Sequence, residues 1–382
     1  MKNSIYISVL ILLGCVACQS NRSLKEGNSW NLEMAMNIER VNTLEECSDS
    51  IVYIPLETND SSLLANRAYL LYADNSDIFV KSNDYLYRFN ADGHYLNRIG
   101  RKGMAPGEYA RLESVSVDRE NRRIFCYTGN NKGQYWGYDG AFLKEIVLDG
   151  NGKNLSQSIV SGSQIVAERR EYTDSGLRID ICFFSLEGAL LQEIPLAQDD
   201  KEVNVSMHTV PLVYTFGGDL KYKDTYSPAL LSFNNKGSQV EWIFDLGKYE
   251  PSREYLEDMN KRGTLMREMV QLVDIKESRT HFFLLLVHDY RLRGVVMDKE
   301  SGTLVYSKEI EMPQKGGGIE LGKIKGGCFW PSFADNSRAV YGLVSVSSLP
   351  EESFQAITHC ALNHFPLTED SNPVVVKAFL KK

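Results

Sequence analysis

Asp92-Gly93-His94-Tyr95-Leu96, Asp139-Gly140-Ala141-Phe142-Leu143 and Glu187-Gly188-Ala189-Leu190 repeat one pattern, an acidic residue and a glycine followed by apolar residues. Looser copies follow at Asn235-Lys236-Gly237 and Ser301-Gly302-Thr303-Leu304. The glycines are separated by 47, 48, 49 and 65 residues, and the longest interval contains a segment with helical patterning. A fixed period of this length is typical of a fold built from repeated units.

Each period contains about four short β-rich runs. In the second period these are Leu112–Asp118, Arg123–Tyr127, Gln134–Tyr138 and Phe142–Leu148. The Asp-Gly pair joins the third run to the fourth, where glycine supplies the positive φ of a tight hairpin. Four strands in each period indicate the blade of a β-propeller. A sandwich does not repeat one turn at fixed spacing, and a parallel α/β fold needs helices between its strands.

The five turns account for five blades, and the C-terminal region supplies three strands of a sixth. These strands are Cys328–Phe333, Arg338–Val346 and Asn372–Leu380, and Ser50–Leu56 is a spare strand near the N-terminus. We therefore predict an all-β, six-bladed β-propeller of four-stranded blades, closed by the N-terminal strand in the last blade. Closure of this kind leaves no open edge between the first and last blades. Seven blades is the alternative.

Two small helical inserts are expected on the ring. The first runs from Pro251 to Met269, opens with Ser252 as a capping residue, and is interpreted as packed on the propeller rather than as a ligand lid. The second runs from about Pro350 to His364 and is expected to bridge two strands of the last blade.

The first residues have the layout of an export signal. Lys2 supplies a positive charge, Ile5–Leu13 is apolar, and a small residue precedes Cys15. A cysteine in this place indicates a bacterial lipoprotein, with Cys15 as the lipidated residue and Cys18 as the alternative; a cleaved signal without lipid is the other reading. We predict a signal peptide over residues 1–14, a polar tether over 15–38 and the propeller over 39–382.

Composition excludes some classes of function. The chain has 42 Lys+Arg against 50 Asp+Glu and a net charge of −8, which argues against nucleic acid as a partner. Its one strongly apolar stretch, Ile5–Leu13, is too short to span a bilayer, so membrane contact is expected through the lipid anchor alone. The other cysteines are scattered and are interpreted as buried thiols; they are Cys47, Cys126, Cys182, Cys328 and Cys360.

Three segments resemble the six-bladed β-propeller lipoproteins of Bacteroidetes, which are themselves similar to NHL-repeat propellers. They are the entry strand Ile54–Thr58, the loop Ile99–Tyr109 and the closing strand Asp370–Val376. The loop departs from the commoner pattern in having Met104-Ala105 where a glycine is often found. The resemblance covers the chain from about residue 40 onward. It implies the propeller fold and a cell-envelope location, lipid-anchored at the outer membrane and facing the periplasm or the surface, and it leaves the activity open.

The NHL-like loop is interpreted as a structural link between blades. Its glycines and proline would turn the chain sharply, and its glutamate would accept backbone N–H groups. The residues concerned are Gly100, Gly103, Pro106, Gly107 and Glu108. The alternative is an anion-binding nest in which Arg101 and Lys102 assist the loop amides.

No motif in the sequence identifies a catalytic or metal-binding residue. Gly317–Lys323 is close to a P-loop, but Ile324 stands where Ser or Thr must bind Mg²⁺. Asp149–Asn154 has alternating oxygen donors but lacks the glutamate that a calcium-binding EF-hand requires. The six histidines show no ligand spacing. In a propeller the residues that meet at the central channel come from different blades, so sequence spacing carries no information about them.

Two classes of function follow. The first is a lipid-anchored binding or interaction module for a glycan, a peptide or a partner protein. The alternative is a metal-dependent lyase or hydrolase, with a divalent cation such as Ca²⁺ held by side chains at the central channel. The ligand-binding and catalytic residues are unknown at this level.

Overall fold

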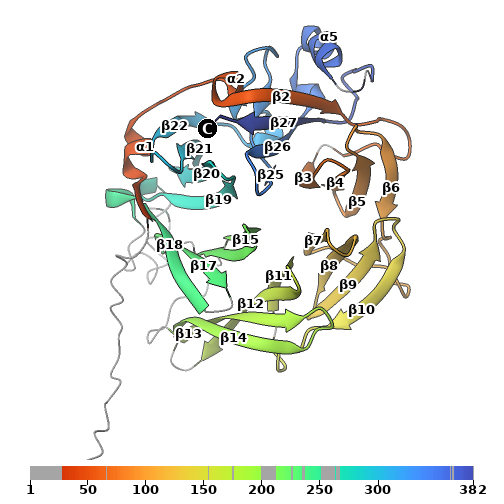
Figure 1. The fold of residues 1–382 in the computed structure, drawn as a ribbon, viewed down its shortest axis with the longest axis vertical. Coiled ribbons are helices and arrows are strands. Elements are labelled where there is room, and N and C mark those ends of the chain that lie inside the picture. Colours follow the sequence, from red (N-terminus) through yellow and green to blue (C-terminus); the bar gives the residue numbers. More distant parts are fainter. Residues whose placement is uncertain are drawn as a thin grey trace, which may run out of the picture.

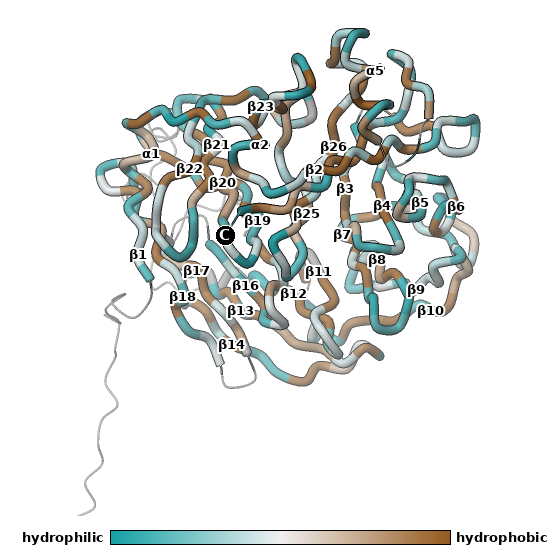
Figure 2. The backbone as a smooth tube through the Cα atoms, turned by 45° about the horizontal axis from the view of Figure 1, so that its top comes forward, coloured by the Kyte–Doolittle hydropathy of each residue, from teal (hydrophilic) through white to brown (hydrophobic). Residues whose placement is uncertain are grey.

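The fold is a ring of six radiating β-sheets (Figure 1). It is seen in a computed structural model that describes residues 28–381, except for 66, 154, 174–175, 199–211, 225–226, 235–236, 251–262, 264–266, 362 and 364. The first strand of each sheet lies nearest the ring centre (Figure 1). Hydrophobic stretches concentrate in the strands and hydrophilic stretches in the turns, as Figure 2 shows. The predicted six-bladed propeller is confirmed.

The first three blades follow one another along the chain, each ordered from the centre outward. Blade 1 comprises β3 (Ala68–Ala73), β4 (Asp77–Ser82), β5 (Tyr85–Asn90) and β6 (Tyr95–Ile99). Blade 2 comprises β7 (Ser114–Asp118), β8 (Arg123–Gly129), β9 (Lys132–Gly137) and β10 (Phe142–Val147). Blade 3 comprises β11 (Leu155–Ser161), β12 (Gln164–Thr173), β13 (Gly176–Ser185) and β14 (Leu190–Gln198).

The other three blades each involve the N-terminal segment. Blade 4 comprises β15 (Leu212–Phe216), β16 (Asp219–Lys223), β17 (Ala229–Asn234) and β18 (Gly237–Asp245), with β1 (Asn28–Asn31) added outside β18. Blade 5 comprises β19 (Gln271–Glu277), β20 (His281–His288), β21 (Arg291–Asp298) and β22 (Leu304–Ile310). Blade 6 comprises β25 (Phe333–Ala334), β26 (Ala339–Val344), β27 (Val374–Leu380) and β2 (Ser48–Pro55).

The ring is closed by β2, as predicted. It pairs antiparallel with β27, from Ser48 opposite Leu380 to Pro55 opposite Val374. The prediction that Cys328–Phe333 forms the first strand of this blade is wrong. Residues Cys328–Phe329 are a separate strand, β24, which pairs with β23 (Ile319–Glu320) outside the blade. The first strand of blade 6 is the two-residue β25.

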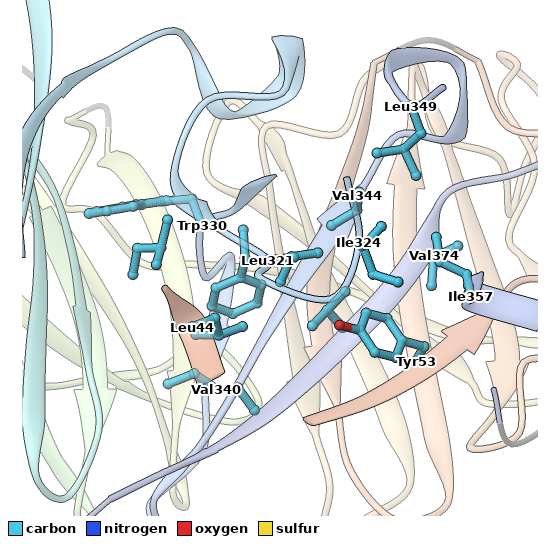
Figure 3. Packing of buried hydrophobic residues seen from close by; sticks show 14 of the residues in the cluster. Leu44, Tyr53, Leu321, Ile324, Trp330, Val340, Val344, Leu349, Ile357 and Val374 are labelled. Carbon is cyan, nitrogen blue, oxygen red and sulfur yellow. The ribbon is translucent and has the colours of Figure 1, made fainter. Parts of the chain in front are cut away.

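Blade 6 is held by a large apolar cluster. Tyr53 of β2 packs there with Leu44 of α2 (Leu44–Cys47), Leu321 and Ile357 (Figure 3). Ile357 belongs to α5 (Glu351–Cys360), which follows β26 and precedes β27 in the sequence. The second helical insert was predicted at this place. Most of the first predicted insert, Pro251 to Met269, lies outside the described residues. None of the helices that the structure describes is both long and apolar enough to cross a membrane.

The N-terminal segment, residues 28–55, runs along the outer edges of three blades. The strand β1 pairs in parallel with β18, and α1 (Glu33–Asn37) follows it. Arg40 then forms a β-bridge with Ser307 on the outer strand of blade 5, before β2 joins blade 6. The predicted tether over 15–38 is therefore wrong in its last part, because residues 28–37 form elements that pack on the propeller. The polar composition of this segment suggested a tether, but residues Asn28–Asn31 form a strand in which Trp30 is buried.

The repeated glycines have a second role besides turning the hairpin. Gly93, Gly140 and Gly188 all have φ between 84° and 93°. A β-carbon on each would lie 2.2, 2.4 and 2.2 Å from a carbonyl oxygen of Pro55, Arg98 and Val147 respectively, on the outer strand of the preceding blade. The pattern therefore marks the places where adjacent blades approach too closely for any side chain.

Gly188→Ala is expected to destabilise the fold by about 2–4 kcal/mol, because it combines left-handed backbone strain with an inter-blade clash. Gly162→Ala is the matched control. Gly162 has φ +57° but nothing within 4 Å of an added β-carbon, so only about 1 kcal/mol of strain is expected. Urea unfolding of both variants measures the difference. Equal losses in the free energy of unfolding would show that the close approach between the blades does not contribute to the destabilisation.

Candidate functional site

The inner strands around the channel carry polar side chains as well as apolar ones. Ser114 Oγ donates to the Ser158 carbonyl oxygen at 2.7 Å, and Ser116 Oγ accepts from the Val160 N–H at 3.2 Å, which joins β7 to β11. Asp274 and Lys276 form an ion pair on β19. Within the described ranges no three His, Cys, Asp or Glu side chains are arranged to hold a metal ion.

The turns of three blades converge on one face of the ring. In an antiparallel blade, the turn after the first strand and the turn after the third strand lie at the same end. The Arg279 N–H of blade 5 donates to the Ser337 carbonyl of blade 6 at 2.9 Å. The Gly217 N–H of blade 4 donates to Asn336 Oδ1 at 3.1 Å. These contacts fix the three turns relative to one another.

A recess of about 500 Å³ lies between the turns of blades 5 and 6. We call it the turn recess, and all the residues that line it are polar. They are Arg279, Thr280, Asp298, Lys299, Glu300, Ser337 and Arg338. The first five belong to blade 5, in the turns that follow β19 and β21 or at the end of β21. A hydrogen bond from the Lys299 N–H to the Thr280 carbonyl, at 2.8 Å, joins these two turns.

One wall of the turn recess is a fixed ion pair. Lys299 Nζ lies 2.6 Å from Glu277 Oε1, whose side chain is fully buried. The Tyr214 hydroxyl donates to Glu277 Oε2 at 2.8 Å, and the ammonium lies 4.6 Å from the ring centre of Phe216. Burial raises the pKa of Glu277 above its ordinary value, although the Lys299 ammonium opposes this. The charge of Lys299 is thus matched within the protein.

The two arginines of the turn recess differ in whether their charge is paired. Arg338 Nη1 lies 2.7 Å from Asp49 Oδ2 and donates to the Leu380 carbonyl at 2.8 Å, so its charge is also matched. Arg279 is exposed, and its guanidinium has no hydrogen bond or ion pair within the part of the chain that the structure describes. It is the cation of this recess that is available to a ligand.

The Asp298 carboxylate of the recess is oriented by the turn between β21 and β22. Asp298 Oδ1 accepts from both the N–H and the hydroxyl of Ser301 at 2.7 Å. Burial alone would raise the pKa of Asp298, but these hydrogen bonds outweigh it and hold that pKa below its ordinary value. His281 lies 3.7 Å away, and burial lowers its pKa, so this histidine is neutral at pH 7. Asp298 and the exposed Glu300 therefore remain as acceptors.

A second recess, of about 440 Å³, adjoins the first and shares Lys299 and Glu300 with it. We call it the edge recess because β1 forms one of its walls. Its remaining lining is amide, hydroxyl and apolar: Asn28, Ser29, Trp30, Asn31, Met34, Trp242, Met297, Ser301 and Gly302. The rings of Trp30 and Trp242 are 4.5 Å apart and form the floor with Met297.

The NHL-like loop lies away from both recesses, since a link from β6 to β7 occupies the opposite face of the ring. The Ala105 N–H donates to Glu108 Oε2 at 3.0 Å, and the Gly103 N–H donates to the Tyr109 carbonyl at 3.0 Å. A β-carbon at position 103 would lie 1.8 Å from Glu108 Oε2. Gly100 and Gly107 have φ of 69° and 78°, and Pro106 lies between the two ends of the turn. The loop's own carboxylate thus occupies the space an anion would need.

Neither recess was predicted from the sequence. Arg279, Asp298 and Ser337 lie in three different turns of two blades, so no spacing links them. The signal that could have found them was the position of each turn within its blade. Cys15 and Cys18, the candidates for lipidation, lie outside the described residues.

Comparisons with known proteins show the family of the chain. Residues 28–379 match the family described as "Domain of unknown function (DUF4934)". The chain belongs to the DUF4934 family. The match begins at the first residue of β1, which agrees with the inclusion of the N-terminal segment in the folded body. A search of curated proteins found no match.

Solved structures share the fold of this DUF4934 chain. A Bacteroides fragilis protein named "Putative exported protein" is 18% identical, with a TM-score of 0.69, covering 93% of this chain and 99% of its own. A Bacteroides thetaiotaomicron protein of unknown function is 9% identical, with a TM-score of 0.43, covering 86% of this chain and 76% of its own. The first likeness supports the propeller fold.

Proposed function

We propose that this DUF4934 chain is an exported, lipid-anchored propeller of the cell envelope that binds a neutral glycan in the turn recess. The observation that carries the proposal is the lining of that recess, where Arg279, unpaired among the described residues, lines the same space as the oriented carboxylate of Asp298 and the exposed carboxylate of Glu300. The lipid anchor rests on the signal sequence ending at Cys15, or alternatively Cys18, and the name of the Bacteroides fragilis relative agrees with export.

The chemistry of the lining favours a ligand rich in hydroxyl groups. Each sugar hydroxyl both donates and accepts a hydrogen bond, and the recess presents Arg279 as donor close to Asp298 and Glu300 as acceptors. The charges of Lys299 and Arg338 are matched by Glu277 and Asp49. The unmatched groups then sum to one negative charge, which disfavours an anionic ligand.

A thermal-shift screen of the purified protein against neutral oligosaccharides, acidic oligosaccharides and peptides tests this proposal. A ligand at 100 times its Kd adds about 2.7 kcal/mol of stability, which raises the melting temperature measurably. We expect the shift with neutral oligosaccharides. A shift with peptides alone, or with acidic sugars alone, would contradict the proposal.

Arg279→Ala is expected to weaken binding of the neutral oligosaccharide at least tenfold, a change of about 1.4 kcal/mol. The reason is the loss of the one lining cation without a partner in the described residues. Arg101→Ala is the matched control, since Arg101 is an exposed arginine in the NHL-like loop on the opposite face. Isothermal titration calorimetry measures both. If Arg101→Ala weakens binding and Arg279→Ala does not, the site lies in the loop.

A further inference from the structure

The edge recess differs from the turn recess because apolar as well as polar side chains line it. Its floor is apolar, formed by Trp30, Trp242 and Met297, each no more than 7% exposed. Its rim holds the side-chain amides of Asn28 and Asn31, both exposed. Amide groups next to a small apolar surface complement a substituent that has an amide and a methyl group together.

The two rim amides are available for such a substituent. Asn31 Oδ1 accepts from the Met34 N–H at 3.2 Å, which orients this side chain and leaves its Nδ2 donors directed elsewhere. The Asn28 side chain has no hydrogen bond in the described part of the chain. A ligand C=O can accept from Asn31 Nδ2, and a ligand N–H can donate to Asn28 Oδ1. Met34, 41% exposed, borders the same space and can cover a methyl group.

We infer that the two recesses together bind a neutral oligosaccharide that carries acetamido groups. One sugar would lie in the turn recess with its hydroxyls between Arg279 and Glu300, and the acetamido group of a neighbouring sugar would enter the edge recess. Lys299 and Glu300 line both recesses, so the two spaces adjoin at these residues. This inference rests on the proposed function and specifies its ligand class.

Two probes with the same β-1,4-linked glucose backbone separate the effect of the acetamido group. Chitotetraose carries an acetamido group on each sugar, and cellotetraose carries a hydroxyl in its place. Calorimetric titration of the whole protein is expected to give at least tenfold tighter binding of chitotetraose. Equal affinities, or tighter binding of cellotetraose, would overturn the inference while leaving the proposed function intact. Failure of both probes, and of the other neutral oligosaccharides, would contradict the proposed function itself.

Substitutions then locate the acetamido contact. Met34→Ala is expected to weaken chitotetraose binding at least threefold and to leave cellotetraose binding unchanged. Met312→Ala is the matched control, because Met312 is 51% exposed and lines neither recess. Arg279→Ala should weaken both probes, since it acts in the turn recess. If Met34→Ala and Met312→Ala bind chitotetraose equally well, the edge recess does not hold the acetamido group.

Discussion

A chain that begins at Glu57, and so lacks β2, is expected to lose cooperative folding. Removing β2 exposes the edge of β27, where Val374, Val375 and Val376 are fully buried. It also removes Tyr53 from the cluster on one side of blade 6 and Ile54 from the cluster on the other. Because β2 serves both clusters and closes the ring, no remaining strand can replace it.

Two longer chains serve as controls for this truncation. A chain that begins at Asn28 keeps every described element and should melt like the full-length protein. A chain that begins at Val41 keeps α2 and β2 but loses β1 and α1, and should fold with a lower melting temperature. Circular dichroism melting and size-exclusion chromatography measure all three. A cooperative transition at the full-length temperature in the Glu57 chain would refute the role assigned to β2.

Lys299→Met is expected to destabilise the protein by about 3–5 kcal/mol at pH 7, because it leaves the buried carboxylate of Glu277 without its cation. Met keeps the length of the side chain near Phe216 and Phe282, so the charge is the main change. The double variant Glu277→Gln with Lys299→Met removes both charges and should recover most of the loss. Urea unfolding gives each free energy.

The loss in Lys299→Met should depend on pH. The folded-state pKa of Glu277 is already raised above 4.5 by burial, and removing the ammonium raises it further. A carboxyl with a raised folded-state pKa stabilises the fold at low pH, and this contribution is lost as the pH rises through that pKa. The deficit should therefore shrink when the pH falls from 7 toward 4.5. A deficit that is constant over this range, or smaller than 1 kcal/mol at pH 7, would count against a buried unpaired charge.

The fold was predictable because its information is local and repeated. The turns at Gly93, Gly140 and Gly188 recur at nearly equal spacing, and each marks a hairpin that lies against the preceding blade. The shared last blade followed from counting strands. By contrast, β1 is a short polar segment, Asn-Ser-Trp-Asn, that pairs in parallel with a strand more than 200 residues away. Its strand conformation depends on a non-local contact, so the sequence of the segment alone does not predict it.

The candidate site was not predictable for a related reason. The turn recess depends on Arg279, Asp298 and Ser337 meeting at one face, and only the curvature of the ring brings them together. The loop at Gly100–Glu108 had the more distinctive sequence, yet its glycines are explained by positive φ and by the space that Glu108 fills. In this chain the conspicuous motif marks a place where the backbone is constrained, whereas the side chains that line the candidate site belong to no motif.

The path of the N-terminal segment also determines how the protein would respond to mechanical force. A pull on the chain before Asn28 reaches β1 first, where hydrogen bonds to β18 and the buried ring of Trp30 resist it. Next in line are α1 and the Arg40 bridge to Ser307. Only after these contacts break does the load reach β2. A propeller held to a membrane by its N-terminus would thus have two sacrificial attachments that protect the closure of the ring.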